Sequence, residues 1–228
     1  MRCSAMEKQE MLALLDYTLL KPTANRDEIT AFCKETIKYQ FKTVFVNPYW
    51  IPYVCSLLKS EKIKVGAPIG FSLGGATTKT KIIETEEAIQ NGAEEIDMLI
   101  NLGALKSKDY EVVKNDISAV VKAANGHLTK VIIETALLTD EEKVTACKLI
   151  MDAGADYVKT ATGFNGGGAT VKDIKLLKSV VGDTIKIKAA GGVRSWQDAC
   201  DMVAVGASRI GTSNAVKIIL GQHIDSGY

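Results

Sequence analysis

The chain has 228 residues, of which 46% are hydrophobic and 24% are charged, and its formal net charge at pH 7 is +1. This composition is typical of a soluble globular protein, and a net charge so close to zero argues against a general attraction to nucleic acid or to anionic lipid. We therefore expect no nucleic-acid-binding protein. No stretch approaches the roughly eighteen apolar residues that a membrane span needs, so we also expect no membrane protein.

Short β-branched segments alternate with amphipathic stretches along the whole chain, which is the pattern of repeated βα units. The eight predicted strands cover residues 15–20, 43–47, 64–69, 95–101, 130–135, 156–160, 185–189 and 208–211. The eight predicted helices cover residues 26–39, 48–60, 78–91, 110–124, 140–152, 170–181, 195–205 and 213–220. No linker divides the chain, so we predict one domain over residues 1–228, a (β/α)8 barrel with a short extra helix within residues 1–11 at its N-terminal end.

In such a barrel, catalytic side chains project inward from the carboxyl ends of the strands. Apolar residues alternate in the fourth predicted strand and should face the helices, which leaves Asp97 on the inward face. The same alternation turns Lys159 of the sixth strand and Lys188 of the seventh strand inward, and it places Asp16 and Thr18 of the first strand together on one face. We therefore expect these five polar side chains to converge on one mouth of the barrel.

Two lysines in buried strands beside glycine turns indicate Schiff-base chemistry. A neutral lysine amine near pH 7 requires its pKa to fall by roughly three units, about 4 kcal/mol, and a second ammonium group about 4 Å away supplies nearly that much. We assign Lys159 as the nucleophile, Lys188 as the neighbouring cation and Asp97 as the proton shuttle. The alternative is a structural ion network in which both lysines pair with Glu95, Asp97 and Glu134.

Glycine-containing segments follow the last three predicted strands, at residues 162–168, 190–193 and 211–214. Exposed backbone N–H groups in such turns suit a phosphate dianion, although βα turns also use glycine for conformational reasons alone. Asp16 and Thr18 could bind substrate hydroxyls or simply anchor the first strand. The candidate substrate-binding residues are Asp16, Thr18, Thr162, Gly163, Phe164, Gly191, Gly192, Gly211, Ser213 and Asn214.

The cysteines and histidines argue against disulfides and metals. The five cysteines are odd in number and widely scattered, so we interpret them as reduced thiols of a cytoplasmic protein. The two histidines, His127 and His223, are too few and too far apart for a metal cluster. The N-terminus has no long apolar segment typical of a secretion signal.

Several of these segments together resemble the deoxyribose-phosphate aldolase family, class I aldolases built on a (β/α)8 barrel. The resemblance covers nearly the whole chain. Its main segments are Leu-Asp-Tyr-Thr-Leu-Leu-Lys-Pro at residues 15–22, Val-Gly-Ala-Pro-Ile-Gly-Phe at 65–71, Glu-Ile-Asp-Met at 95–98, and residues 44–48, 130–135, 157–164, 186–194 and 209–213.

The resemblance implies that Lys159 forms an imine with acetaldehyde and that Asp97 and Lys188 form a proton relay. The implied reaction is the reversible cleavage of 2-deoxy-D-ribose 5-phosphate to D-glyceraldehyde 3-phosphate and acetaldehyde, without metal or organic cofactor. A homodimer is common in the family. Two other functions stay open, namely an imine-forming aldolase for a different phosphosugar and a phosphosugar-binding protein whose lysines are structural.

The chain departs from the family pattern at several positions. Phe45 of the second strand stands where many members have cysteine, and a ring there could narrow the pocket. Ala161 and Asn214 stand where serines are frequent. Some members also end in a tyrosine, so Tyr228 either folds over the mouth and assists proton transfer or belongs to a tail without a role.

Overall fold

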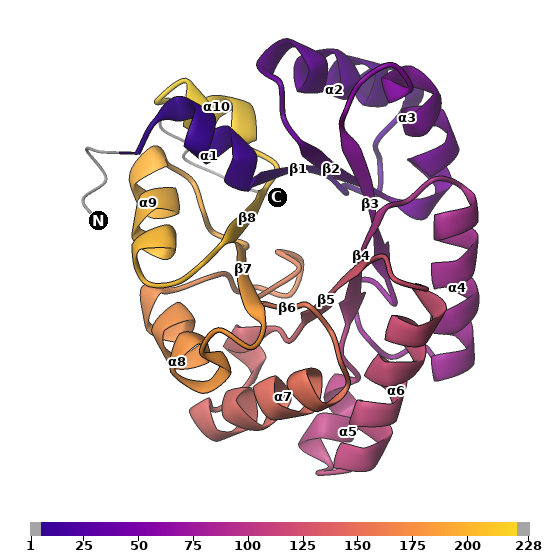
Figure 1. Cartoon of the computed structure of the whole chain (residues 1–228), viewed down its shortest axis with the longest axis vertical. Coiled ribbons are helices and arrows are strands. Elements are labelled where there is room, and N and C mark those ends of the chain that lie inside the picture. Colours follow the sequence, from indigo (N-terminus) through magenta and orange to yellow (C-terminus); the bar gives the residue numbers. More distant parts are fainter. Residues whose placement is uncertain (1–5, 223–228) are drawn as a thin grey trace.

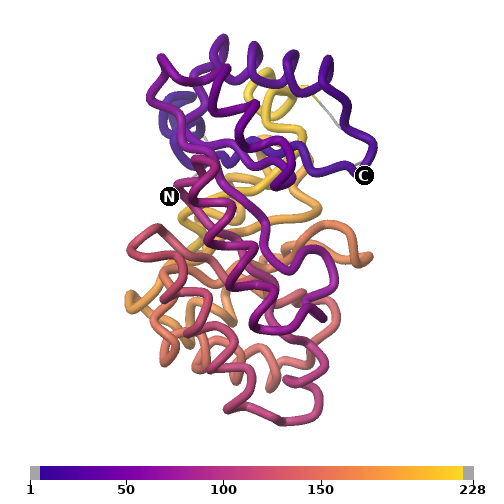
Figure 2. The backbone as a smooth tube through the Cα atoms, turned by 90° about the vertical axis from the view of Figure 1, so that its right-hand side faces the viewer, coloured from indigo at the N-terminus to yellow at the C-terminus, as the bar shows by residue number. Residues whose placement is uncertain are grey.

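The computed structural model describes residues 6–222, and within them eight parallel strands close into a barrel surrounded by helices (Figure 1). The strands are β1 (Leu15–Leu19), β2 (Thr43–Val46), β3 (Lys64–Ile69), β4 (Glu95–Leu99), β5 (Leu128–Ile132), β6 (Tyr157–Lys159), β7 (Lys186–Ala190) and β8 (Arg209–Thr212). Each strand pairs with the next, and β8 pairs with β1 to close the ring. In the side view of Figure 2 the first segments of the barrel, in indigo, and the last, in yellow, accordingly lie in the same part of the molecule. The predicted (β/α)8 barrel is confirmed.

The helices form the outer layer. They are α1 (Lys8–Leu14), α2 (Arg26–Tyr39), α3 (Ile51–Leu58), α4 (Thr78–Gln90), α5 (Leu102–Lys106), α6 (Tyr110–Ala123), α7 (Asp140–Asp152), α8 (Val171–Val181), α9 (Trp196–Ala204) and α10 (Ala215–Ile219). Two 3-10 turns, η2 (Pro48–Trp50) and η3 (Thr135–Leu137), precede α3 and α7.

Two helical segments differ from the prediction. The single helix expected over residues 48–60 is divided into η2 and α3, because Pro52 lacks an N–H and is accommodated in the first turn of α3. The short helix α5 was not predicted, since a five-residue helix is too short to show a periodic apolar face. Its N-cap is Asn101, whose side chain accepts a hydrogen bond from the backbone N–H of Ala104 at 3.0 Å.

The extra helix near the N-terminus is α1, which begins later than expected and leads directly into β1. It packs beside α10 (Figure 1). Cys33, Cys55 and Cys147 are free thiols, but Cys200 is disulfide-bonded, so the expectation of reduced cysteines is wrong for Cys200. Residues 1–5, His223 and Tyr228 lie outside the described residues. Over residues 6–222, no helix is both long and apolar enough to cross a membrane.

Strand alternation divides the buried residues into two layers. On β4, Ile96 and Met98 belong to the apolar core between the strands and the helices, as predicted. Asp97, which lies between them in sequence, is fully buried and contacts lysines of other strands inside the barrel. On β4 the charged Asp97 therefore faces the barrel interior, while Ile96 and Met98 face the helices.

Candidate active site

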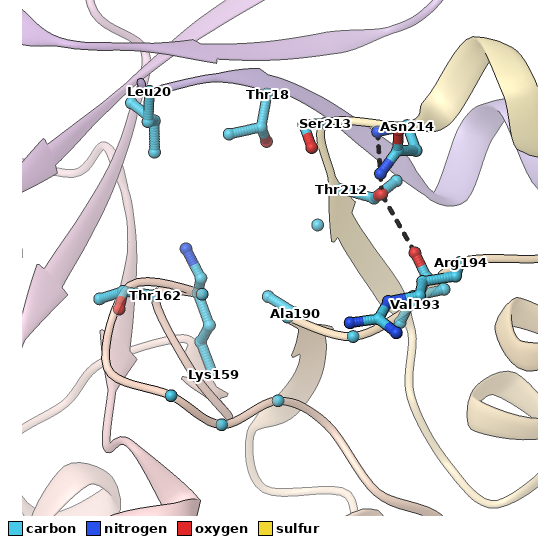
Figure 3. A pocket seen from close by; sticks show the side chains of 17 residues that line it. Thr18, Leu20, Lys159, Thr162, Ala190, Val193, Arg194, Thr212, Ser213 and Asn214 are labelled. Atoms are coloured by element: carbon cyan, nitrogen blue, oxygen red, sulfur yellow. Dashed lines mark hydrogen bonds between the residues drawn. The ribbon is translucent and has the colours of Figure 1, made fainter. Parts of the chain in front are cut away.

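A cavity of about 420 Å³ opens at the carboxyl ends of β1, β6, β7 and β8 (Figure 3). Lys159 extends from β6 into this cavity toward Thr18 and Leu20 on the opposite wall. Lys188, on the neighbouring strand, is buried beneath the cavity and does not line it. Of the two predicted lysines, Lys159 is therefore the one that a substrate in the cavity can reach.

Asp97 lies at the centre of three ammonium groups. Its Oδ2 atom accepts hydrogen bonds from Lys159 at 2.8 Å and from Lys188 at 2.7 Å, and its Oδ1 atom accepts one from Lys130 at 3.0 Å. Burial alone would raise the pKa of Asp97, but the three lysines outweigh burial and hold this pKa well below its usual value. Asp97 is thus an ionised carboxylate at neutral pH, and it brings Lys159 and Lys188 together as the sequence predicted.

Lys188 has a proton that it can release near neutral pH. Burial is the largest influence on this group and lowers its pKa. Asp16 and Asp97 oppose the effect of burial, while the ammonium groups of Lys159 and Lys130 add to it, and the resulting pKa is about 8. A lysine with this pKa, bonded to a carboxylate that also contacts Lys159, is suited to proton transfer.

A second set of charged groups lies inside the barrel, and its cations, Lys130 and Arg209, were not predicted. Lys130 donates to Glu95 at 2.6 Å, and Arg209 donates to Asp16 at 2.8 Å through Nε and to Glu95 at 3.0 Å. The carboxylates outweigh burial and raise the pKa of Lys130, so Lys130 stays charged. Strand alternation could have found both residues, since Val131 and Ile210 beside them face the outer core.

Asp16 has a different position from the one expected. It was expected at the mouth of the barrel, where it would either bind substrate hydroxyls or anchor the first strand, but it is fully buried beneath the cavity, where it contacts Lys188 and Arg209. Burial would raise the pKa of Asp16, but Lys188, Lys130 and Arg209 lower it below its usual value. Asp16 is therefore a partner of the lysines rather than part of the cavity wall.

The predicted glycine segments form one wall of the cavity (Figure 3). A Cβ atom on Gly168 would lie 2.6 Å from the backbone of Gly191, and the N–H of Ala169 donates to the carbonyl of Gly191 at 2.9 Å, so the loops after β6 and β7 pack directly together. The predicted residues that line the cavity are Thr18, Lys159, Thr162, Gly163, Gly191, Gly192, Gly211, Ser213 and Asn214.

Two residues of the rim differ from the prediction. Phe164 does not line the cavity, because its ring packs edge-on against Phe71 of the loop after β3, with 5.4 Å between ring centroids. Arg194 does line the cavity and was not predicted, although a cation two residues after the glycine turn at residues 191–192 was a usable signal. It contributes a positive charge to the glycine-rich wall. Within residues 6–222 no group of three metal-ligating side chains is present.

A family model described as "DeoC/LacD family aldolase" matches residues 10–220. The chain belongs to the DeoC/LacD family of aldolases. This aldolase is 56% identical over 223 residues to the protein named deoxyribose-phosphate aldolase 2 of Oceanobacillus iheyensis, covering 98% of this chain and 100% of the relative. It is also 51% identical over 220 residues to the deoxyribose-phosphate aldolase of Thermococcus kodakarensis, and this match covers 95% of this chain and 98% of the relative.

The fold of this aldolase also matches a solved structure. The tetrameric deoxyribose phosphate aldolase from Aeropyrum pernix superposes with a TM-score of 0.88 at 32% identity, covering 94% of this chain and 91% of that one. The predicted family is thereby confirmed, and the chain is an aldehyde lyase.

Proposed function

We propose that this aldolase reversibly cleaves 2-deoxy-D-ribose 5-phosphate to D-glyceraldehyde 3-phosphate and acetaldehyde through a Schiff base on Lys159. The observation that carries the proposal is the position of Lys159 on the cavity wall, with its Nζ atom 2.8 Å from a carboxylate oxygen that Lys188 also contacts. The names of the relatives support this choice of substrate.

The reaction begins when the neutral amine of Lys159 attacks the aldehyde carbon C1 of the open-chain sugar. The carbinolamine then loses water to give an iminium ion. The C3 hydroxyl loses its proton, the C2–C3 bond breaks, and its electron pair forms an enamine on Lys159 while C3 becomes the aldehyde of glyceraldehyde 3-phosphate. Protonation of the enamine carbon and hydrolysis of the iminium release acetaldehyde and restore the lysine.

Asp97 and Lys188 act as the proton relay for these steps. Lys188 supplies the proton that the departing hydroxyl of the carbinolamine needs, and Asp97 passes protons between Lys188 and the reacting atoms through water. The pKa of about 8 for Lys188 suits both halves of the reversible reaction, because the group can give and recover a proton near neutral pH.

The phosphate end of the substrate binds on the glycine-rich wall. Gly191, Gly192, Ser213 and Asn214 line the cavity there, and Arg194 adds a positive charge at the same side. Backbone and side-chain donors with one arginine match the acceptors and charge of a phosphate dianion. Thr18 lies beside Ser213 on the cavity wall (Figure 3), and its hydroxyl is our candidate for contact with the sugar hydroxyls.

Borohydride reduction in the presence of acetaldehyde, followed by peptide mass mapping, tests the Schiff base. We expect an ethyl adduct on Lys159 that is absent from Lys159→Ala and retained by Lys186→Ala. Lys186 is the matched control because it lies at the exposed start of the same strand as Lys188. Cleavage assays with deoxyribose 5-phosphate and other phosphosugars test the substrate. A phosphosugar-binding protein without enzymatic activity would give neither adduct nor cleavage.

We also propose that the aldolase acts in the cytoplasm as a homodimer and needs no metal or organic cofactor. Light scattering tests the assembly, and activity after treatment with a chelator tests the independence from metal. A tetramer in solution would correct the first of these proposals, since the relative from Aeropyrum pernix is described as tetrameric.

A further inference from the structure

The ring of Phe45 lies inside the barrel against the lysine cluster. Phe45 projects inward from β2 and is 1% exposed. Its ring centroid is 3.9 Å from the Nζ atom of Lys188, 4.7 Å from that of Lys130 and 5.9 Å from that of Lys159. An ammonium group within about 6 Å of an aromatic centroid is attracted by the negative face of the ring, and the attraction is stronger where water is excluded. Lys188 is therefore the group on which Phe45 acts most strongly.

Charged groups from four strands surround the ammonium group of Lys188, and the ring of Phe45 lies beside them. Asp16 of β1 and Asp97 of β4 contact Lys188 directly, while Lys130 of β5 and Lys159 of β6 approach it as like charges. The neighbouring β8 presents Gly211, and a Cβ atom at that position would lie 2.9 Å from the Cε atom of Lys188. The ring of Phe45 adds a negative surface beside these groups, with its centroid 3.9 Å from the Nζ atom of Lys188.

The carboxylates of the network inside the barrel are shared between several basic side chains. The cations in the described network are Lys130, Lys159, Lys188 and Arg209, and the carboxylates bonded to them are Asp16, Glu95 and Asp97. Both carboxylates that contact Lys188 are shared with other cations. The aromatic face of Phe45 therefore gives Lys188 a further attractive partner beside carboxylates that it shares with other basic groups.

Gly66 of β3 fixes the ring in this position. A Cβ atom at Gly66 would lie 2.3 Å from the Cε1 and Cζ atoms of Phe45, so the ring occupies the space that any side chain at residue 66 would need. Gly66 is directly paired with Phe45 in the sheet. The close fit leaves the ring little freedom to turn away from the lysines.

We propose that Phe45 is a positioning residue of this aldolase, whose ring face binds the ammonium group of Lys188 and holds it, protonated, against Asp97. The proposal rests on the proposed function, because protonated Lys188 is the acid of the relay. Loss of the negative ring face destabilises the charged form of Lys188, so its pKa falls. The alkaline limb of the pH–rate profile, where Lys188 gives up its proton, then moves to lower pH, by on the order of one unit.

Fluorinated phenylalanines at position 45 test the proposal, because successive fluorines weaken the negative ring face with little change in size. Cleavage is measured against pH for the protein with phenylalanine, 4-fluoro-, 3,5-difluoro- and 3,4,5-trifluorophenylalanine at this position, and for Phe45→Leu. The control is Phe41→Leu, since Phe41 is fully buried in the outer layer against Tyr17 and its ring lies over no lysine of the described network. The fluorinated series remains informative even where Phe45→Leu does not fold.

The titration of Lys188 is also followed by NMR of protein with 13C-labelled lysine, with its signal assigned by its loss in Lys188→Met. We expect both the alkaline limb and this titration to move down in pH with each fluorine and to stay in place in Phe41→Leu. A series in which the NMR pKa of Lys188 moves by less than about 0.2 unit, or one in which Phe41→Leu moves it equally, overturns the role of Phe45. A protein without cleavage or imine would refute the proposed function instead, because the NMR titration needs no turnover.

Discussion

The Nζ atom of Lys188 lies 2.5 Å from the Oδ2 atom of Asp16 in the barrel interior beneath the cavity. Both side chains are almost completely buried, at 1% and 0% exposure, so their charges are poorly screened by solvent. The contact joins β7 to β1 and gives Lys188 a second carboxylate beside Asp97. Asp16 thus favours the protonated form of Lys188, which burial disfavours.

Asp16→Asn should lower the pKa of Lys188 and shift the alkaline limb of the pH–rate profile to lower pH by about one unit or more. The reason is that an opposite charge at contact distance is lost while the like charges of Lys130 and Lys159 remain. The measurement is kcat for cleavage between pH 6 and 10. Glu95→Gln is the control, because Glu95 contacts Lys130 and Arg209 but not Lys188. Equal shifts in the two variants would argue against direct pairing.

Lys159→Arg should reduce cleavage by at least about three orders of magnitude, since a guanidinium cannot form the imine. Lys188→Met should keep imine formation with acetaldehyde but lose about 10²–10⁴-fold in kcat, as expected when a general acid is removed. Single-turnover borohydride trapping measures imine formation, and steady-state cleavage measures kcat. Loss of trapping in a folded Lys188→Met protein would assign the nucleophile to Lys188 instead.

Lys130→Met should destabilise the fold by about 3–5 kcal/mol, because Glu95 and Asp97 would share a fully buried site with one fewer cation. Urea unfolding gives the free energy difference. Lys186→Met is the matched control, since Lys186 lies at the exposed start of β7, and its effect should stay within about 0.5 kcal/mol. Adding Glu95→Gln to Lys130→Met should recover part of the loss.

Lys188 should also make stability depend on pH in a defined window. Its pKa is about 8 in the folded protein and 10.5 as a free side chain, so between these values the unfolded chain binds more protons. Lys188 therefore makes the folded state more stable as pH rises through the window, by about 1 kcal/mol per pH unit. Thermal or urea unfolding of wild type and Lys188→Met across pH 8 to 10 isolates this slope. Parallel curves for the two proteins would contradict it.

Gly66→Ala should destabilise the protein by roughly 1–3 kcal/mol, as overpacking of a close-packed interior does. The added methyl group would meet the ring of Phe45, and that ring is enclosed by β-strands and lysines. The double variant Gly66→Ala with Phe45→Leu should be less destabilised than the sum of the single variants. Simple additivity in a double-mutant cycle would show that the two residues do not share this space.

The sequence could predict the upper part of the site because strand alternation is a local property. Once the eight strands were recognised, alternation turned Asp97, Lys159 and Lys188 inward, and the structure places their charged groups in contact. Lys130 and Arg209 follow the same rule, but Lys130 is the central residue of β5 and Arg209 is the first residue of β8, and no glycine turn lies directly beside either of them. A prediction based on the carboxyl ends of the strands therefore did not include Lys130 and Arg209.

Contacts between distant segments of the sequence explain the remaining differences between the predicted site and the structure. Phe164 was assigned to the substrate from its position beside a glycine loop, but its orientation depends on the ring of Phe71, which belongs to another loop. Asp16 was expected either to bind substrate hydroxyls or to anchor the first strand, and it contacts Arg209, which is 193 positions away in sequence. No local pattern in the sequence encodes either partner, because both are set by how the barrel closes.

The closure of the barrel has a consequence for synthesis of the chain. β1 is made first and pairs with β8, which is made last, and Arg209 of β8 is the residue that bridges Asp16 and Glu95. A nascent chain that still lacks β8 also lacks the wall formed by residues 211–214, where the phosphate end of the substrate is proposed to bind. The growing polypeptide therefore contains Lys159 and Lys188 before the cavity around them is complete. Imine formation with the substrate requires that β8 has been synthesised and has paired with β1.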